Sequence, residues 1–181
     1  MNKAINQYNM RVQKRSGVYE EVSFDKILNR IKGLSQGSEF NHKLDIDETI
    51  IAQKVIQQVH DGVKASELDE LASQTAIAMY SKNPDFKVLA SRIVVSNHHK
   101  NTLNTFSDKI QLMCDYECNG INKPLIADYL YELVMNHKEK IDLAIDYSKD
   151  YDFDFFGHKT LEKSYLYRLG KDIIERPQDM L

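Results

Sequence analysis

The stretch RVQKRSGVYEEVSFDKILNRIKGL, residues 11–34, organises the rest of the chain. Its β-branched residues Val12, Val18 and Val22 suit half-buried strand positions. Between these valines, Ser16-Gly17 supplies the permissive backbone that a tight turn requires. The stretch therefore begins with a predicted β-hairpin.

The period of the apolar residues changes after Ser23, where a helix is predicted to begin. One face of that helix is apolar and consists of Phe24, Ile27, Leu28, Ile31 and Leu34. The start of a helix has unpaired N–H groups and a dipole that favours anions. The hairpin places the cations Lys14 and Arg15 beside this helix start, and that arrangement suits a polyphosphate.

Lys14 and Arg15 also have a plainer interpretation. An Arg side chain can bind phosphate oxygens through a bidentate fork, and a Lys side chain binds them as a mobile point charge. Yet a Lys-Arg pair in a turn is more often an exposed surface feature than a ligand site. Charge alone therefore does not decide between the two interpretations.

After Leu34 the sequence predicts amphipathic helices joined by short loops. Capping signals mark three helix starts, at Asp45 with Glu48, at Ser66 with Asp69, and at Asn83-Pro84. Apolar residues at helical spacing follow each of these signals. Four helices after one hairpin predict a mainly α fold, in which a small β-hairpin or sheet caps a four-helix bundle.

Further helices are predicted beyond residue 101. Phe106, Ile110 and Met113 share one helix face, and Pro124 is the predicted first residue of another helix. Three more features are expected: an irregular aromatic segment YDFDFFGH at 151–158, a helix from Thr160, and a turn at 169–171 before a strand at 173–174. The final PQDML carries no recognisable capping signal, which favours a chain that stops inside or just before an element.

Composition excludes several classes of protein. Of 181 residues, 42% are hydrophobic and 28% are charged, as in soluble globular proteins. No apolar run reaches membrane-spanning length, and MNKAINQYNM lacks the core of a signal peptide, so we expect a cytoplasmic protein without a membrane partner. A net charge of -3 argues against a general nucleic-acid binder.

The two cysteines are too few for a disulfide framework. Cys114 and Cys118 are four residues apart, which predicts one shared helix face and ordinary reduced thiols. The adjacent His98 and His99 would project in different directions from a helix. No metal site is therefore expected.

The wider motif around the hairpin resembles a known family. V-x-K-R-x-G-x-x-E-x-V-x-F-D-K-I, residues 12–27, is similar to the ATP-cone, the N-terminal allosteric module of ribonucleotide reductases. Four later segments resemble, in that family's order, the large subunit of class I ribonucleoside-diphosphate reductase: GVKASELDELASQTA, NPDFKVLASRIVVSNHHK, YDFDFFGHKTLEKSYL and ERPQDML. The resemblance covers essentially the whole chain from Arg11 onward.

The resemblance implies three regions and no catalytic residue. They are a flexible N-terminal arm at 1–10, an ATP-cone at 11–101, and at 102–181 a helical N-terminal segment of the large-subunit body, truncated before the catalytic barrel. In the family, the catalytic cysteines and the barrel follow the point where this chain ends. The chain is then part of an oxidoreductase that cannot reduce nucleotides alone, either as a split-gene piece or as a truncated product.

The resemblance also implies an allosteric nucleotide site. Lys14 and Arg15 match the phosphate-contacting pair, and the segment matching the one that wraps base and ribose is Glu20, Glu21, Val22, Ser23, Phe24, Asp25 and Lys26. Asp69 matches a position that influences how ATP and dATP are told apart, and Lys100 matches a lysine that reaches the phosphates. Ala65 stands where relatives commonly carry threonine. The alternative without a ligand makes Glu20 a solvated strand residue, Asp69 a first-turn acid favoured by the helix dipole, and Lys100 a surface cation.

The effector implied is ATP or dATP, with Mg²⁺ bridging phosphate oxygens. In the family, ATP keeps the enzyme active and dATP promotes inhibitory assemblies, so the partners implied are the remaining large subunit, the radical-generating small subunit and further copies. Two alternatives remain open. One is a scaffold piece that binds no nucleotide, and the other is a free-standing regulator, such as the zinc-ribbon repressors, which need paired CxxC motifs and a basic face that this sequence lacks.

Overall fold

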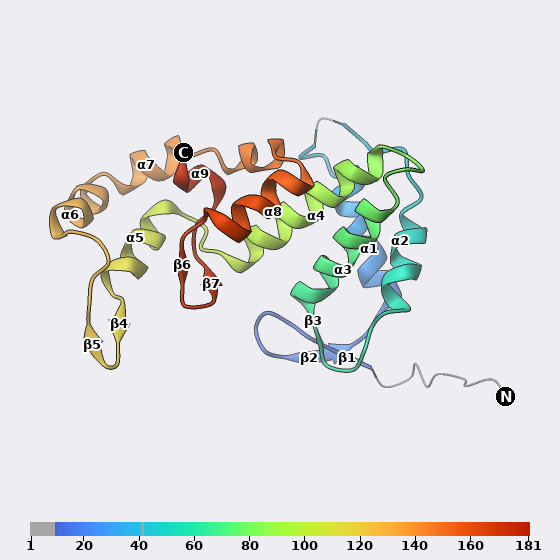
Figure 1. Cartoon of the computed structure of the whole chain (residues 1–181), viewed down its shortest axis with the longest axis horizontal. Helices are drawn as coiled ribbons and strands as arrows, with labels where there is room; N and C mark the ends of the chain where they lie inside the picture. Colours follow the sequence, from blue (N-terminus) through green and yellow to red (C-terminus); the bar gives the residue numbers. More distant parts are fainter. Residues whose placement is uncertain (1–9, 41) are drawn as a thin grey trace. The chain divides into compact units, whose positions relative to one another are not determined.

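The computed structural model describes residues 10–40 and 42–181, which divide into two compact units (Figure 1). The first unit comprises the described residues up to Asn97 together with Asp154–His158, and the second comprises His98–Phe153 and Lys159–Leu181. The predicted flexible arm lies outside the described residues except for Met10.

A small sheet of order β2-β1-β3 belongs to the first unit. Strand β1 (Arg11–Gln13) pairs antiparallel with β2 (Tyr19–Glu21) and parallel with β3 (Val63–Lys64). The predicted hairpin is thus confirmed, and Gly17 takes a φ of +83° in its turn, where a side chain would be strained. Val18 lies in this turn rather than in a strand and is 59% exposed, so its predicted half-buried position is wrong.

The helices α1 to α4 supply most of the first unit's core. They are α1 (Phe24–Gln36), α2 (Glu48–Ile56), α3 (Ala65–Ala78) and α4 (Asp85–Asn101). Their buried apolar residues include Ile31, Leu34, Ile51, Ala52, Val55, Ala72, Ala76, Leu89, Ala90, Ile93 and Val94. The chain is therefore mainly α with a small sheet, as the pattern predicts, and the apolar face of α1 packs into this core.

Two of the predicted capping signals are wrong by a few residues. Helix α2 is capped by Asp47, whose Oδ1 accepts from Thr49 N at 2.9 Å, and not by Asp45. At α3, Glu67 Oε2 accepts from Lys64 N at 3.1 Å. Asp69 is thereby left out of the cap, and it is buried. A capping pattern fixes the neighbourhood of a helix start, but not which of several nearby acids is used.

The second unit contains shorter elements. Its helices and strands are α5 (Phe106–Cys114), β4 (Glu117–Cys118), β5 (Ile121–Asn122), α6 (Asp128–Asn136), α7 (Lys138–Ala144), the 3-10 helix η2 (Tyr147–Asp152), β6 (Arg168–Leu169), β7 (Asp172–Ile173) and α9 (Pro177–Met180). Helix α8 runs over Phe155–Ser164. The pairs β4-β5 and β6-β7 are antiparallel hairpins.

Several predictions for these later residues are wrong in detail. Helix α6 begins at Asp128 rather than Pro124, and α8 begins at Phe155, inside the segment predicted to be irregular. Cys114 ends α5 whereas Cys118 lies in β4, so the two thiols do not share a helix face, although both are free. Spacing of four indicates a shared face only where one helix spans both residues.

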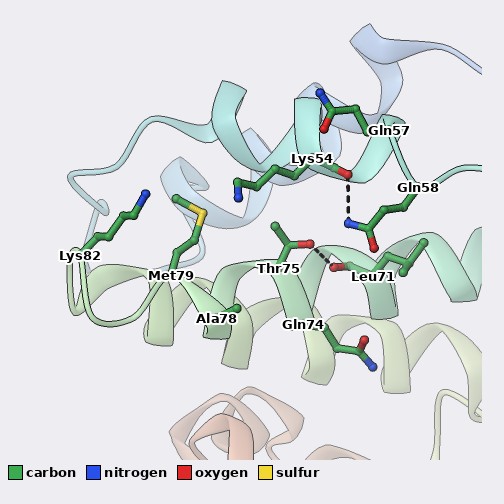
Figure 2. Close-up of a pocket in the computed structure, with 9 residues that line it drawn as sticks. All are labelled: Lys54, Gln57, Gln58, Leu71, Gln74, Thr75, Ala78, Met79 and Lys82. Atoms are coloured by element: carbon green, nitrogen blue, oxygen red, sulfur yellow. Dashed lines mark hydrogen bonds between the residues drawn. The ribbon is translucent and has the colours of Figure 1, made fainter.

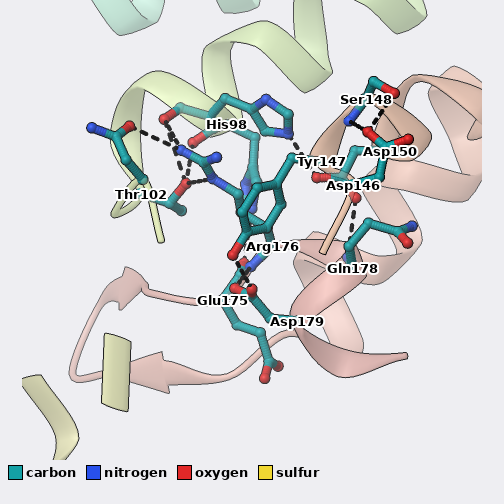
Figure 3. A network of polar contacts seen from close by, with 12 residues as sticks. His98, Thr102, Asp146, Tyr147, Ser148, Asp150, Glu175, Arg176, Gln178 and Asp179 are labelled. Carbon is teal, nitrogen blue, oxygen red and sulfur yellow. Dashed lines mark hydrogen bonds and ion pairs between the residues drawn. The ribbon is translucent and has the colours of Figure 1, made fainter. Parts of the chain in front are cut away.

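Helix α9 is held by a buried polar network in the second unit (Figure 3). The Arg176 side chain donates to Thr102 Oγ1 at 2.9 Å and to His99 O at 3.0 Å, and its guanidinium lies over the Tyr147 ring. Tyr147 donates to Asp179 Oδ1 at 2.5 Å, while Asp179 Oδ2 accepts from Arg176 N at 2.8 Å. Asp179 therefore caps α9, contrary to the prediction that the final residues carry no capping signal.

Within the described residues, none of the helices combines the length and the apolar character needed to cross a membrane.

Candidate functional site

The turn between β1 and β2 directs Arg15 toward two helices of the first unit. Its Nη2 donates to Asp69 Oδ2 of α3 at 3.2 Å and also to Asn97 Oδ1 of α4. Asn97 Nδ2 in turn donates to Ser66 O at 3.2 Å, close to the start of α3. The hairpin, α3 and α4 are thereby joined through one guanidinium.

A second arginine, Arg30 of α1, contacts the same carboxylate. Its Nε donates to Asp69 Oδ1 at 3.2 Å and its Nη2 donates to Asp69 Oδ2 at 3.3 Å. Arg30 Nη2 also donates to Ser96 Oγ at 2.8 Å. Sequence reasoning missed Arg30 as a site residue, because helical spacing indicates only that it lies away from the apolar face of α1.

Glu20 of β2 accepts from two lysines. Its Oε2 lies 2.8 Å from Lys14 Nζ and 2.7 Å from Lys26 Nζ, so one oxygen joins the turn to the first helical turn of α1. Hydrogen bonds from Lys14 and then from Lys26 lower the pKa of Glu20 below its ordinary value. Glu20 is therefore held as a carboxylate between two ammonium groups.

Positive charge exceeds negative charge in these two groups. Four cations contact two carboxylates: Lys14, Arg15, Lys26 and Arg30 against Glu20 and Asp69. The side chains of Lys14 and Lys26 are 48% and 64% exposed, so this excess is accessible from water. Such a surface can attract an anion and donate to several of its oxygens.

The other predicted residues lie around this cluster or apart from it. Ser23 caps α1, its Oγ accepting from Lys26 N at 3.4 Å. Phe24 packs against the main core, and Val22 packs against the smaller cluster that contains Val12 and Val63 of the sheet. Glu21 and Asp25 are exposed. Ala65 begins α3 and is half-buried, and Lys100 is exposed in the last turn of α4, among residues of the second unit.

A separate groove of about 480 Å³ lies between α2 and α3 (Figure 2). Lys54 and Lys82 contribute ammonium groups to it, and no residue predicted for the nucleotide site lines it. Part of its polar surface bonds to the groove's own backbone, since Thr75 Oγ1 donates to Leu71 O at 2.7 Å and Gln58 Nε2 donates to Lys54 O at 3.1 Å. Because Lys54 and Lys82 line it, we consider this groove the rival location for an anion.

Comparison with known proteins agrees with the geometry at the hairpin. Residues 10–101 match the ATP cone domain. The chain is 46% identical over 174 residues to the ribonucleoside-diphosphate reductase large chain of Schizosaccharomyces pombe, and 47% identical over 175 residues to the large subunit of Arabidopsis thaliana. Each alignment covers 95% of this chain but 21% of the relative.

The similarity extends to a viral protein, the ribonucleoside-diphosphate reductase large subunit of vaccinia virus, which is 42% identical over 174 residues and of which 22% is covered. The chain thus spans about a fifth of the length of the curated relatives it matches, and it corresponds to their N-terminal region. The match to the domain includes the hairpin, all four cations of the site and both carboxylates. The chain therefore belongs to the ATP-cone family.

Proposed function

We propose that this chain binds ATP or dATP as the regulatory N-terminal portion of a ribonucleoside-diphosphate reductase large subunit. The observation that carries the proposal is the excess of cations around Glu20 and Asp69, within the residues that match the ATP cone. A triphosphate carries several negative oxygens, and charge-assisted hydrogen bonds to Arg and Lys are the strong way to hold them.

Roles for individual residues follow from their positions. Lys14 and Arg15 would contact phosphate oxygens, and the role of Lys100 stays a prediction from the resemblance. The segment from Glu20 to Lys26 would enclose base and ribose. Asp69 holds Arg15 at 3.2 Å, so it would influence the site through that arginine. Ala65 offers no hydroxyl, and how well the chain separates dATP from ATP would depend on the neighbouring Ser66.

Mg²⁺ would enter with the nucleotide. Glu20 and Asp69 are already paired with Lys or Arg side chains, so they are poor candidates for metal ligands. The phosphates and water would therefore coordinate the ion, rather than a cage of protein carboxylates. The ion would neutralise part of the phosphate charge. The chain's own residues would fix the position of the phosphate oxygens.

Regulation would follow from linkage between the site and other polypeptides. A ligand shifts an equilibrium only through different affinities for two states, so ATP and dATP would stabilise different arrangements with partners. We propose as partners the remaining large-subunit polypeptide, the small radical-generating subunit and further copies of the chain. Reduction of ribonucleotides would depend on those partners, and a cytoplasmic location stays a prediction.

Calorimetric titration of the purified chain with ATP and dATP tests the proposal. The double variant Lys14→Ala/Arg15→Ala should bind ATP at least about tenfold more weakly, because at least one charge-assisted contact is lost. The matched control is Lys54→Ala/Lys82→Ala, which removes the same charge from the rival groove and should bind as the unaltered chain does. Loss of binding in the control alone would move the site to the groove, and an unaltered chain that binds neither nucleotide would favour the scaffold alternative.

A further inference from the structure

We propose that Arg30 is a positioning residue that lets Arg15 leave Asp69 and turn to a phosphate. The inference rests on the proposed function, and it adds a residue that contacts no ligand itself. Its basis is that one carboxylate, Asp69, is shared by two guanidinium groups that come from different elements, the hairpin turn and the middle of α1.

The burial of Asp69 explains why this carboxylate needs a second cation, Arg30, when Arg15 leaves it. It is 6% exposed, and a buried carboxylate without a cation is strongly destabilising. If Asp69 had Arg15 as its sole guanidinium partner, a phosphate could take that arginine only by leaving the carboxylate unpaired. Arg30 removes this penalty, because it contacts both oxygens of Asp69, at 3.2 and 3.3 Å.

The two arginines are held differently. Arg30 lies within the helix α1 and is fixed from the far side by Ser96 Oγ, at 2.8 Å from its Nη2. Ser96 is itself buried. Arg15 lies in a tight turn outside the strands, beside Gly17 with its positive φ. It reaches only one oxygen of Asp69, at 3.2 Å, and the same nitrogen, Nη2, also donates to Asn97 Oδ1. Arg30 is thus the fixed partner of the carboxylate and Arg15 the exchangeable one.

Neutralising Arg30 should therefore weaken the binding of phosphate even though Arg30 touches none. With Gln at position 30, Arg15 stays on Asp69 and the affinity should fall about tenfold. Removing the carboxylate charge as well, in Arg30→Gln/Asp69→Asn, should restore the affinity to within about threefold of the unaltered chain. Thermal melts separate this role from support of the fold, because a loss of affinity in an Arg30→Gln that stays folded at the titration temperature does not come from unfolding.

The test is calorimetric titration of the full chain with inorganic tripolyphosphate and, separately, with ATP. Tripolyphosphate lacks base and ribose, so the loss in Arg30→Gln and the rescue by Asp69→Asn should both appear with this probe. Thermal melts of each variant establish folding. Should Arg30→Gln fail to fold, Arg30→Lys replaces it: the retained charge should keep tripolyphosphate affinity within about threefold, and a tenfold loss would overturn the proposal.

The outcomes separate this inference from the proposed function. Failure of the unaltered chain to bind ATP would refute both. Binding of ATP by the unaltered chain, with equal affinity in a folded Arg30→Gln, would refute only the role of Arg30. A double variant that binds no better than Arg30→Gln would refute it as well.

Discussion

Each unit contains an arginine held by polar partners, yet these arginines differ in exposure. In the first unit, the side chains of Arg15 and Arg30 are 28% and 27% exposed beside Asp69. In the second unit, Arg176 is 5% exposed, and it donates to Thr102, to Asn104 and to a backbone carbonyl. Exposure leaves Arg15 able to change partners, whereas Arg176 is enclosed by protein acceptors.

The ratio of cations to carboxylates also differs between the two units. Around α9, Lys109 lies 3.3 Å from Glu175 and 3.7 Å from Asp179, and the fully buried Asp150 accepts from Gln178 N at 3.0 Å. Carboxylates are therefore at least as numerous there as fixed cations. The hairpin site has the opposite excess. Similar ion pairs thus serve attachment of a helix in one unit and, we propose, anion binding in the other.

Arg176→Met should have the largest effect of the variants considered for this comparison. The substitution removes the donor of Thr102, of Asn104 and of the His99 carbonyl, so the free energy of unfolding should fall by about 3 kcal/mol. Urea denaturation measures this loss. Lys14→Ala/Arg15→Ala should change the same free energy by less than about 0.5 kcal/mol, because these residues are at the surface. An equal loss of unfolding free energy in the two variants would contradict the proposed difference between the enclosed Arg176 and the exposed hairpin cations.

Glu20→Gln should have a smaller effect, in the direction of tighter binding. Glu20 competes with an incoming anion for Lys14 and Lys26, which lie 2.8 and 2.7 Å from one of its oxygens. Neutralising it should strengthen tripolyphosphate binding about threefold, the scale of an exposed ion pair. Titration with ATP is the companion measurement, since any contact of Glu20 with the nucleoside would reduce that gain. Weaker binding of tripolyphosphate would show that Glu20 does not compete.

The pH dependence of Glu20 gives the smallest predicted effect. Lys14 and Lys26 stabilise the ionised form, so the folded-state pKa lies below 4.5. The associated stability is present above the ordinary pKa and is lost as the pH falls through the lowered value. NMR titration of the Glu20 carboxyl carbon should show a midpoint below 4.5 that rises in Lys14→Ala. A Glu20 midpoint that is the same in the unaltered chain and in Lys14→Ala would contradict the described contact with Lys14.

Sequence predicts local structure well at the hairpin and α1, because alternation, turn residues and helical spacing all lie within one short stretch. It fails where a partner is distant. Arg30 and Asp69 are 39 positions apart, and no periodic pattern joins them. Strand β3 has two residues and depends on its pairing with β1, so its own sequence carries too little signal. The resemblance identified Asp69 and Arg15, but not Arg30, which shares the Asp69 carboxylate.

The exchange of Arg15 can be observed directly by NMR of arginine Nε–Hε groups while ATP is added to the full chain. Single Arg→Lys variants assign the signals of Arg15, Arg30 and Arg176. The account predicts that the Arg15 signal moves and saturates at the calorimetric affinity, while the Arg176 signal stays in place. Bound ATP with a stationary Arg15 signal, or with a shift confined to Arg176, would contradict it.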